Sequence, residues 1–164
     1  MNVAVSPHAL LCAHRLISWL VRTRTSPPET LHVEERLTEL ISTLFESPQR
    51  ASSERIAPAR IAHALEYLQA HFSARITLAD VAKFAGCSPC FLSRQFAQHV
   101  GIPMHAYLSK LRVRAALAAV AGGWKDLTAL ALQLGFDSHS HMSAAFKREF
   151  GHSPSAARYD LAPN

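Results

Sequence analysis

The side chains best suited to recognition chemistry gather in two short stretches of the chain, about fifty residues apart. The first contains Ser88, Cys90, Ser93, Arg94 and Gln98, and the second contains Ser138, His139, Ser140, Ser143 and Lys147. Arg94 is the strongest candidate, because a planar guanidinium can meet O6 and N7 of guanine with two hydrogen bonds at once. The alternative for Arg94 is a contact with phosphate or with solvent. Ser88 could bind a phosphate or serve only as a helix cap.

Cysteine and histidine side chains suggest metal binding or thiol chemistry as alternatives to DNA recognition. Cys87 and Cys90 form a Cys-x-x-Cys pair, and His99 and His105 follow. A zinc finger needs four converging ligands and usually about 12 residues between its two pairs, whereas eight residues separate Cys90 from His99. We therefore predict no metal site and expect Cys87 to be a small core residue. A thiol sensor acting through Cys90 stays open, since a cysteine near a helix N-terminus and basic groups can be reactive.

The two stretches belong to one pattern that occurs twice between Leu78 and Pro154. The first copy has Leu78, Val81, Ala82, Ala85, Gly86, Leu92, Phe96 and Gly101, and the second has Leu127, Leu130, Ala131, Leu134, Gly135, Met142, Phe146 and Gly151. The offset is 49 residues up to the first glycine pair and 50 residues from Leu92 and Met142 onward. The second copy therefore has one extra residue in its turn, and duplication of one unit explains the pattern.

Each copy is typical of two helices joined by a tight turn. Gly86 and Gly135 follow the first helix, where a positive φ favours glycine. The predicted N-caps are Thr77 (in a capping box with Asp80), Ser88, Asp126 and Ser138. Two helices joined in this way can place the second one in the major groove of DNA, and an ordinary helical hairpin is the structural alternative.

The distribution of charge favours a DNA-binding role for the repeats. Residues 57–164 contain 11 lysines and arginines against 6 acidic residues, whereas residues 1–56 contain 6 of each. The whole net charge of +5 therefore lies with the repeats. A surface that binds phosphates needs such an excess.

From roughly Ile61 to Tyr159, the chain resembles the DNA-binding domain of the AraC/XylS transcriptional regulators. The matching segments are TLADVAKFAGCSPCFLSRQF, GIPMHAYLSKLRVRAALAAV and ALALQLGFDSHSHMSAAFKREFGHSPSAAR. The resemblance implies an all-α domain with two helix-turn-helix units joined by a long central helix. It also implies that two recognition helices enter successive major grooves of double-stranded DNA, and it favours a structural role for Arg112.

The same resemblance sharpens the predicted contacts. It adds His141 to the candidates for DNA binding and identifies a departure at Ala144, a position that often carries arginine in this family. We therefore expect the first unit to contribute more of the sequence specificity. Double-stranded DNA is the expected partner, and RNA polymerase is a second partner to consider.

Residues 1–46 form a predicted helical segment for linkage or dimerisation, residues 47–58 a flexible linker, and residues 59–160 the DNA-binding domain. Apolar side chains recur at helical spacing over residues 8–22, and again at Leu37, Leu40, Ile41 and Leu44. We expect the second set to lie on one face, to pack away from the repeats and to form a homodimer contact. The alternative is that these helices cover the DNA-binding domain.

Other classes of function find little support in the sequence. The ten histidines have no carboxylate or nucleophile at a matching spacing, so we predict that the protein is not an enzyme and needs no cofactor. There is no signal-peptide pattern and no membrane partner is expected, which predicts a cytoplasmic protein. The family resemblance implies a bacterial regulator. A rival role is a helical protein-interaction module. No sensor domain precedes the repeats, so the effector is not predicted, and the sequence fits both a fragment of a longer regulator and a naturally short one.

Overall fold

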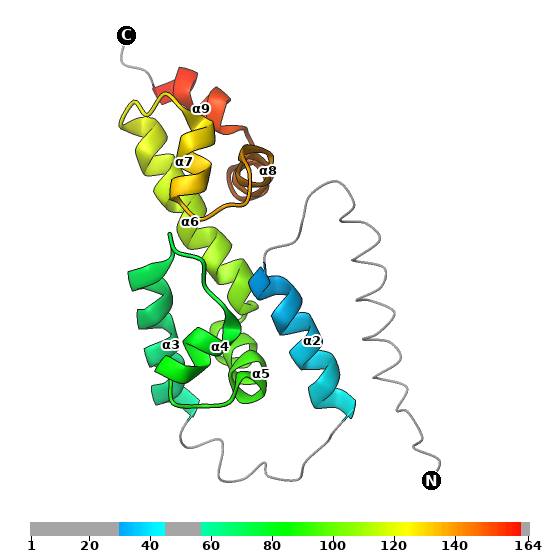
Figure 1. The fold of residues 1–164 in the computed structure, drawn as a ribbon. Coiled ribbons are helices and arrows are strands. Elements are labelled where there is room, and N and C mark those ends of the chain that lie inside the picture. Colours follow the sequence, from blue (N-terminus) through cyan, green and yellow to red (C-terminus); the bar gives the residue numbers. More distant parts are fainter. Residues whose placement is uncertain (1–29, 45–56, 162–164) are drawn as a thin grey trace. The chain divides into compact units, whose positions relative to one another are not determined.

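The computed structural model describes residues 30–44 and 57–161 of the 164-residue chain, and in this part all regular structure is helical (Figure 1). The helices are α2 (Thr30–Leu44), α3 (Ala57–His71), α4 (Leu78–Phe84), α5 (Pro89–Val100), α6 (Met104–Ala121), α7 (Leu127–Gln133), α8 (His139–Phe150) and α9 (Pro154–Leu161). The predicted all-α fold is confirmed. Of the predicted N-terminal segments, the helix over residues 8–22 lies outside the described residues, as does the linker except for Ala57 and Pro58, which begin α3.

The described helices form two compact units, joined by the chain through α3 and α6. The first unit contains α2, α4, α5 and α3 as far as Leu68, and it ends at Met104. The second contains residues 69–75, the rest of α6, and α7 to α9. Across the described residues, no helix combines the length and hydropathy needed to cross a bilayer.

The first unit buries one side of each of its helices. Leu68 of α3, Val81 of α4, and Leu92 and Phe96 of α5 have no exposed surface. Helices α4 and α5 pack directly on each other. Ala82 is buried in α4, where its methyl side chain allows close packing of neighbouring helices.

The second unit repeats this arrangement around its own core. Its buried cluster combines residues of α6, α7, α8 and α9 and of the turn between α7 and α8: Val113, Ala116, Val120, Leu127, Leu130, Ala131, Leu134, Phe136, Met142, Ala145, Phe146 and Ala157. The pairs Leu92 and Met142, and Phe96 and Phe146, are fully buried at matching positions of α5 and α8. The predicted duplication is therefore visible in the core as well as in the sequence.

Helix α2 differs from the expectation that this segment packs away from the repeats. It contacts α4 and α5 within the first unit, and its Leu31 and Glu35 side chains are buried. Leu37 and Ile41 are exposed on another face of the helix, while Leu40 is half-buried. The side chain of Leu44 lies outside the described set. An amphipathic pattern predicts that one face is buried, but it does not identify the neighbour.

Candidate nucleic-acid interface

The first helix-turn-helix begins with the predicted capping box. The Asp80 backbone N–H donates to Thr77 Oγ1 at 3.2 Å, and the Thr77 backbone N–H donates to Asp80 Oδ2 at 3.1 Å. The Thr77 hydroxyl also donates to Asp80 Oδ2 at 2.6 Å. This bond and the one from the Thr77 backbone N–H hold the pKa of the Asp80 carboxyl below its ordinary value, because they favour the charged form. The box fixes the start of α4, the helix that supports the recognition helix.

The turn and the second helix follow the predicted chemistry. Gly86 has φ +66°, and the Cys87 N–H donates to the Ala82 carbonyl at 3.0 Å, so the turn closes the end of α4. Ser88 Oγ then accepts from the Phe91 N–H at 3.2 Å and caps α5, with Pro89 at its first position. These local interactions set the direction in which α5 leaves the turn.

The second helix-turn-helix uses the same devices. Asp126 Oδ1 accepts from the N–H groups of Thr128 and Ala129 at 2.9 Å each and caps α7. The Phe136 N–H donates to the Ala131 carbonyl at 2.9 Å across the turn, where Gly135 has φ +81°. Ser138 Oγ accepts from the His141 N–H at 3.1 Å and caps α8. All four predicted N-caps are therefore confirmed.

Helix α5 presents a polar face whose members are four residues apart. Arg94 and Gln98 are exposed, and Cys90, one turn earlier, is half-buried. Residues at this spacing lie along one side of a helix. Ser93 is half-buried next to this row. The five candidates of the first stretch thus come from one helix and its cap.

Helix α8 presents the equivalent face with different residues. With the 50-residue offset, Ser140, Ala144 and Arg148 correspond to Cys90, Arg94 and Gln98, and all three are exposed. Lys147 is exposed beside them. Arg148 is missing from the sequence-based candidates, although the offset from Gln98 would have identified it. The departure at Ala144 therefore leaves a methyl group at the centre of this face.

The remaining candidate side chains on α8 are less exposed to solvent. The ring of His141 packs edge-on against Phe136, with centroids 5.5 Å apart, and its Nδ1 lies 3.7 Å from Asp137 Oδ2. His139 and Ser143 contact each other, with Nε2 and Oγ 3.3 Å apart. The offset matches His141 to Phe91, which is also half-buried. His141 therefore has a packing role in addition to any contact with DNA.

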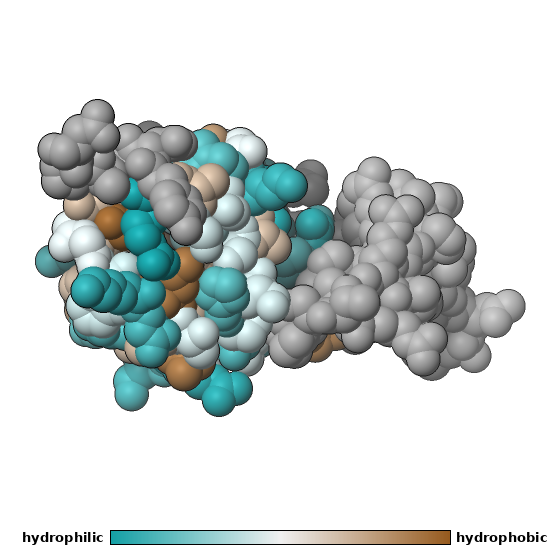
Figure 2. Space-filling view, turned by 90° about the horizontal axis from the view of Figure 1, so that it is seen from above, coloured by the Kyte–Doolittle hydropathy of each residue, from teal (hydrophilic) through white to brown (hydrophobic). Residues whose placement is uncertain are grey.

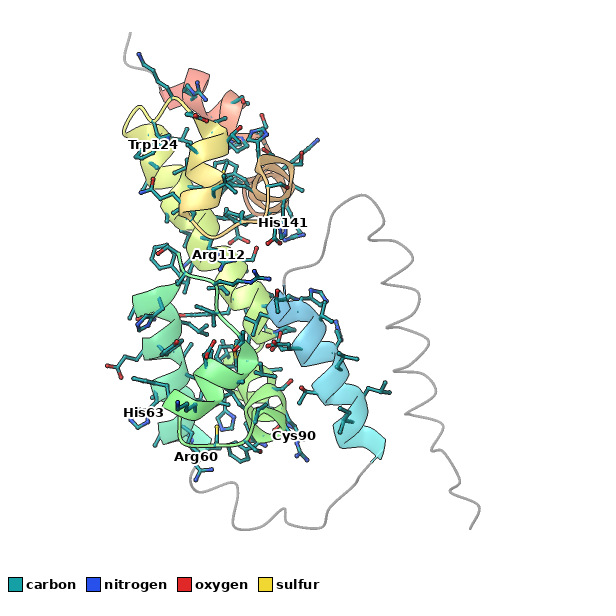
Figure 3. All side chains as sticks on the ribbon, in the orientation of Figure 1. Arg60, His63, Cys90, Arg112, Trp124 and His141 are labelled. Carbon is teal, nitrogen blue, oxygen red and sulfur yellow. The ribbon has the colours of Figure 1, made fainter. Side chains whose placement is uncertain are left out.

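Arg112 has the structural role that the resemblance implied. Its side chain is buried, its Nε donates to the Phe72 carbonyl at 2.7 Å, and its Nη2 donates to the Ala74 carbonyl at 2.9 Å (Figure 3). The guanidinium group also lies over the Phe136 ring, 5.8 Å from its centroid. Arg112 thus joins the segment after α3 to the turn between α7 and α8.

The cysteine pair shows no metal-binding geometry in the described part of the chain. No group of three or more histidine, cysteine or acidic side chains converges there. Cys87 is half-buried, and this burial raises the pKa of its thiol, which keeps the protonated form. Cys90 is half-buried on α5 (Figure 3), and a sensor role for it stays a prediction.

The surface fits a polar ligand better than an extended apolar partner. On the face shown in Figure 2, hydrophobic residues occupy small areas that are separated by hydrophilic ones. The exposed large apolar side chains of the described residues come from three helices and one loop: Leu37, Ile41, Phe84, Trp124 and Leu132. The interaction-module alternative therefore lacks a continuous apolar surface on this face.

Comparisons with known proteins agree with this geometry. The model of a family described as "Helix-turn-helix domain" matches residues 81–159. The transcriptional activator RhaS of Escherichia fergusonii is 33% identical over 100 residues, which cover 61% of this chain and 36% of RhaS. The chain thus spans about a third of the length of this curated relative.

Solved structures give the same result. The C-terminal domain of AraT, a response regulator from Geobacillus stearothermophilus, is 32% identical, with a TM-score of 0.60 over 64% of this chain and 88% of that domain. A transcriptional regulator of Chromobacterium violaceum, described as containing an AraC-type DNA-binding domain, is 25% identical, with a TM-score of 0.58 over 69% of this chain and 97% of the other. Two matching helix-turn-helix units, a connecting long helix and these similarities lead to one assignment: this chain belongs to the AraC family of helix-turn-helix transcription regulators.

Proposed function

We propose that this chain binds specific sequences of double-stranded DNA, with α5 and α8 each entering a major groove, and thereby controls transcription. The observation that carries the proposal is the equivalence of these two helices. Each has 12 residues, a serine N-cap and a left-handed glycine at its end, and each exposes polar side chains at matching positions. An α-helix fits the B-DNA major groove, which is about 12 Å wide. A DNA-binding regulator of this family is not an enzyme, in agreement with the prediction from sequence.

Individual roles follow from the chemistry of the exposed faces. Arg94 is suited to guanine and Gln98 to adenine, because each can form two hydrogen bonds to the edge of that base. Lys147 and Arg148 supply positive charge for phosphates at the C-terminal half of α8. The remaining proposed contacts are shorter polar side chains near the start of each helix: Ser88, Cys90, Ser93, Ser138, His139, Ser140, His141 and Ser143. Contact with RNA polymerase stays a prediction from the sequence.

Selection of bound sites from random double-stranded DNA, followed by titration at several salt concentrations, tests this function. We expect a preferred site and a steep loss of affinity with salt, because each phosphate contact contributes about 0.9 to the slope of log K against log salt. Lys147→Ala and Arg148→Ala should each lower that slope, whereas Gln133→Ala, an exposed change on α7, should leave it unchanged. Recovery of random sequences, or an affinity that does not depend on salt, would exclude the proposal.

Self-association through α2 is a second proposal, and a specific observation favours it. Leu37 and Ile41 are 44% and 54% exposed, and they lie one turn apart on the same face of α2. Their exposure fits a contact with a second copy of this chain, because two apolar faces would leave water together. We expect Ile41→Asp to lower the mass found by analytical ultracentrifugation and Arg36→Ala to leave it unchanged. A wild-type chain that is monomeric at high concentration would contradict this proposal.

A further inference from the structure

The matched family domain begins at residue 81, yet the side chains of an earlier helix bind its first helix-turn-helix. Glu34 Oε2 accepts from the backbone N–H of Leu78 at 2.6 Å. Glu35 Oε1 accepts from the backbone N–H of Met104 at 2.8 Å. Adjacent carboxylates of α2 therefore bind two backbone amides that are 26 residues apart in the sequence.

Both amides occupy the same kind of position. Leu78 is the first residue of α4 and Met104 is the first residue of α6. The first N–H groups of a helix have no acceptor within the helix, and the positive end of the helix dipole favours a negative charge there. In α4, Thr77 accepts from the Asp80 amide, so Glu34 serves a different amide of the same first turn. Helix α2 thus completes the N-terminal capping of two other helices.

Burial makes these contacts more than surface ion–dipole interactions. Glu35 is 5% exposed and Leu31, one turn earlier, is 1% exposed. A buried carboxylate is stable only when hydrogen bonds replace its lost hydration. Helix α2 also packs against α5 itself. Apolar packing and charge-assisted hydrogen bonds therefore both hold α2 against the other helices of the first unit.

Leu78 and Met104 enclose the whole first helix-turn-helix, because α4, its turn and α5 lie between them. We propose that Glu34 and Glu35 are positioning residues for DNA recognition: α2 holds the helix before α5 and the helix after it, and so fixes the orientation of α5. The proposal rests on the proposed role of α5 in binding DNA. In the second unit, Asp126 caps α7 as Thr77 caps α4, by accepting from amides of the first turn.

Three variants of the full chain test this role. Glu35→Ala removes the acceptor, Glu35→Gln keeps an acceptor oxygen without the charge, and Glu39→Ala is the matched control, since Glu39 is exposed on the same helix and pairs with Arg36. Amide hydrogen exchange is measured by NMR. Affinity is measured for the selected DNA site and for two versions in which either half of the site is scrambled.

We expect Glu35→Ala to speed exchange at the Met104 amide and in α5 at least tenfold, in line with the loss of a hydrogen bond to a charged group. Affinity for the full site should fall roughly tenfold, with the loss confined to the half bound by α5. Glu35→Gln should recover most of both properties, and Glu39→Ala should match the wild type. A general loss of stability would instead affect both halves of the site equally.

Unchanged exchange at Met104 and in α5, or equal losses at both halves of the site, would overturn the positioning role. If Glu35→Ala loses its helical circular dichroism, Glu34→Ala decides the matter: faster exchange at the Leu78 amide and in α5 supports the role, and wild-type rates in α5 overturn it. A wild-type chain without a preferred DNA site would refute the proposed function alone. The exchange rates in α5 would still test whether α2 holds that helix.

Discussion

The two helix-turn-helix units differ less in their supporting structure than in the surface they offer to DNA. Their N-caps lie at matching positions, as do the turn glycines Gly86 and Gly135 and the fully buried aromatic residues Phe96 and Phe146. On the exposed faces, however, the positions of Arg94 and Gln98 in the first unit are occupied by Ala144 and Arg148 in the second. After a duplication, packing restrains the core of both copies, whereas the solvent-facing positions can change without loss of the fold.

The turns of the two units also differ in how closely they are packed. A Cβ on Gly86 would have no neighbour within 4 Å. A Cβ on Gly135 would lie 2.8 Å from the Ser73 carbonyl oxygen and 2.8 Å from Arg112 Nη2. Glycine is therefore favoured at position 86 only because of the positive φ. At position 135 it is favoured by the positive φ and also by the lack of space for a Cβ.

The largest expected effect separates these two turns. Gly86→Ala should lower the free energy of unfolding by about 1 kcal/mol, the usual cost of placing a Cβ at positive φ. Gly135→Ala should lower it by roughly 2–4 kcal/mol, because the backbone oxygen of Ser73 must also move. Urea denaturation followed by circular dichroism measures both. Equal losses for the two variants would show that the contact with Ser73 relaxes at little cost.

Arg94→Ala should weaken binding to the preferred site by about 1–3 kcal/mol, since a guanidinium can form two hydrogen bonds to guanine. Binding to random DNA should stay much closer to the wild type, because base contacts contribute little there. Fluorescence anisotropy with both DNAs gives the two values. If both affinities fall by the same amount, Arg94 contacts phosphate and the first unit loses its proposed advantage in specificity.

The reverse change at the matching position sharpens the comparison. Ala144→Arg places a guanidinium at the centre of the exposed face of α8, and we expect an increase of about 1 kcal/mol in DNA affinity together with a stronger preference in the second half of the site. Repeating the selection from random DNA measures that preference. A selection and an affinity identical to those of the wild type would mean that α8 stays distant from the bases.

The smallest expected effect concerns acid sensitivity of the first unit. Because folding lowers the pKa of Asp80, its carboxylate contributes stability that is complete above the ordinary aspartate pKa. The contribution is lost as the pH falls through the lower pKa of the folded state. Asp80→Asn should therefore cost about 0.5 kcal/mol near pH 7, as weak capping changes do, and nothing in strong acid. A cost that does not change with pH would assign it to geometry and not to charge.

Local chemistry was predictable from the sequence, and contacts between distant residues were not. The N-caps and the glycines at positive φ depend on a few neighbouring residues, so Ser88, Ser138, Gly86 and Gly135 were identified correctly. Packing of α2 on the DNA-binding domain was the alternative to the predicted dimer contact. The roles of Glu34 and Glu35 were not predicted, since the amides that they bind lie 44 and 69 residues further along the chain. Arg148 was missed, although the 50-residue offset from Gln98 identifies its position.

The contacts of α2 have a consequence for how such regulators can be recombined. Glu34 and Glu35 complete the starts of α4 and α6 from outside the matched family domain. A chimaera that joins residues from 81 onward to the N-terminal segment of another regulator would lack α2, and so would lose the acceptors that Glu34 and Glu35 provide for α4 and α6. Exchange between relatives should succeed where the new segment supplies two acidic side chains at this spacing. A junction that keeps both caps therefore lies before α2, and not at the start of the matched family domain.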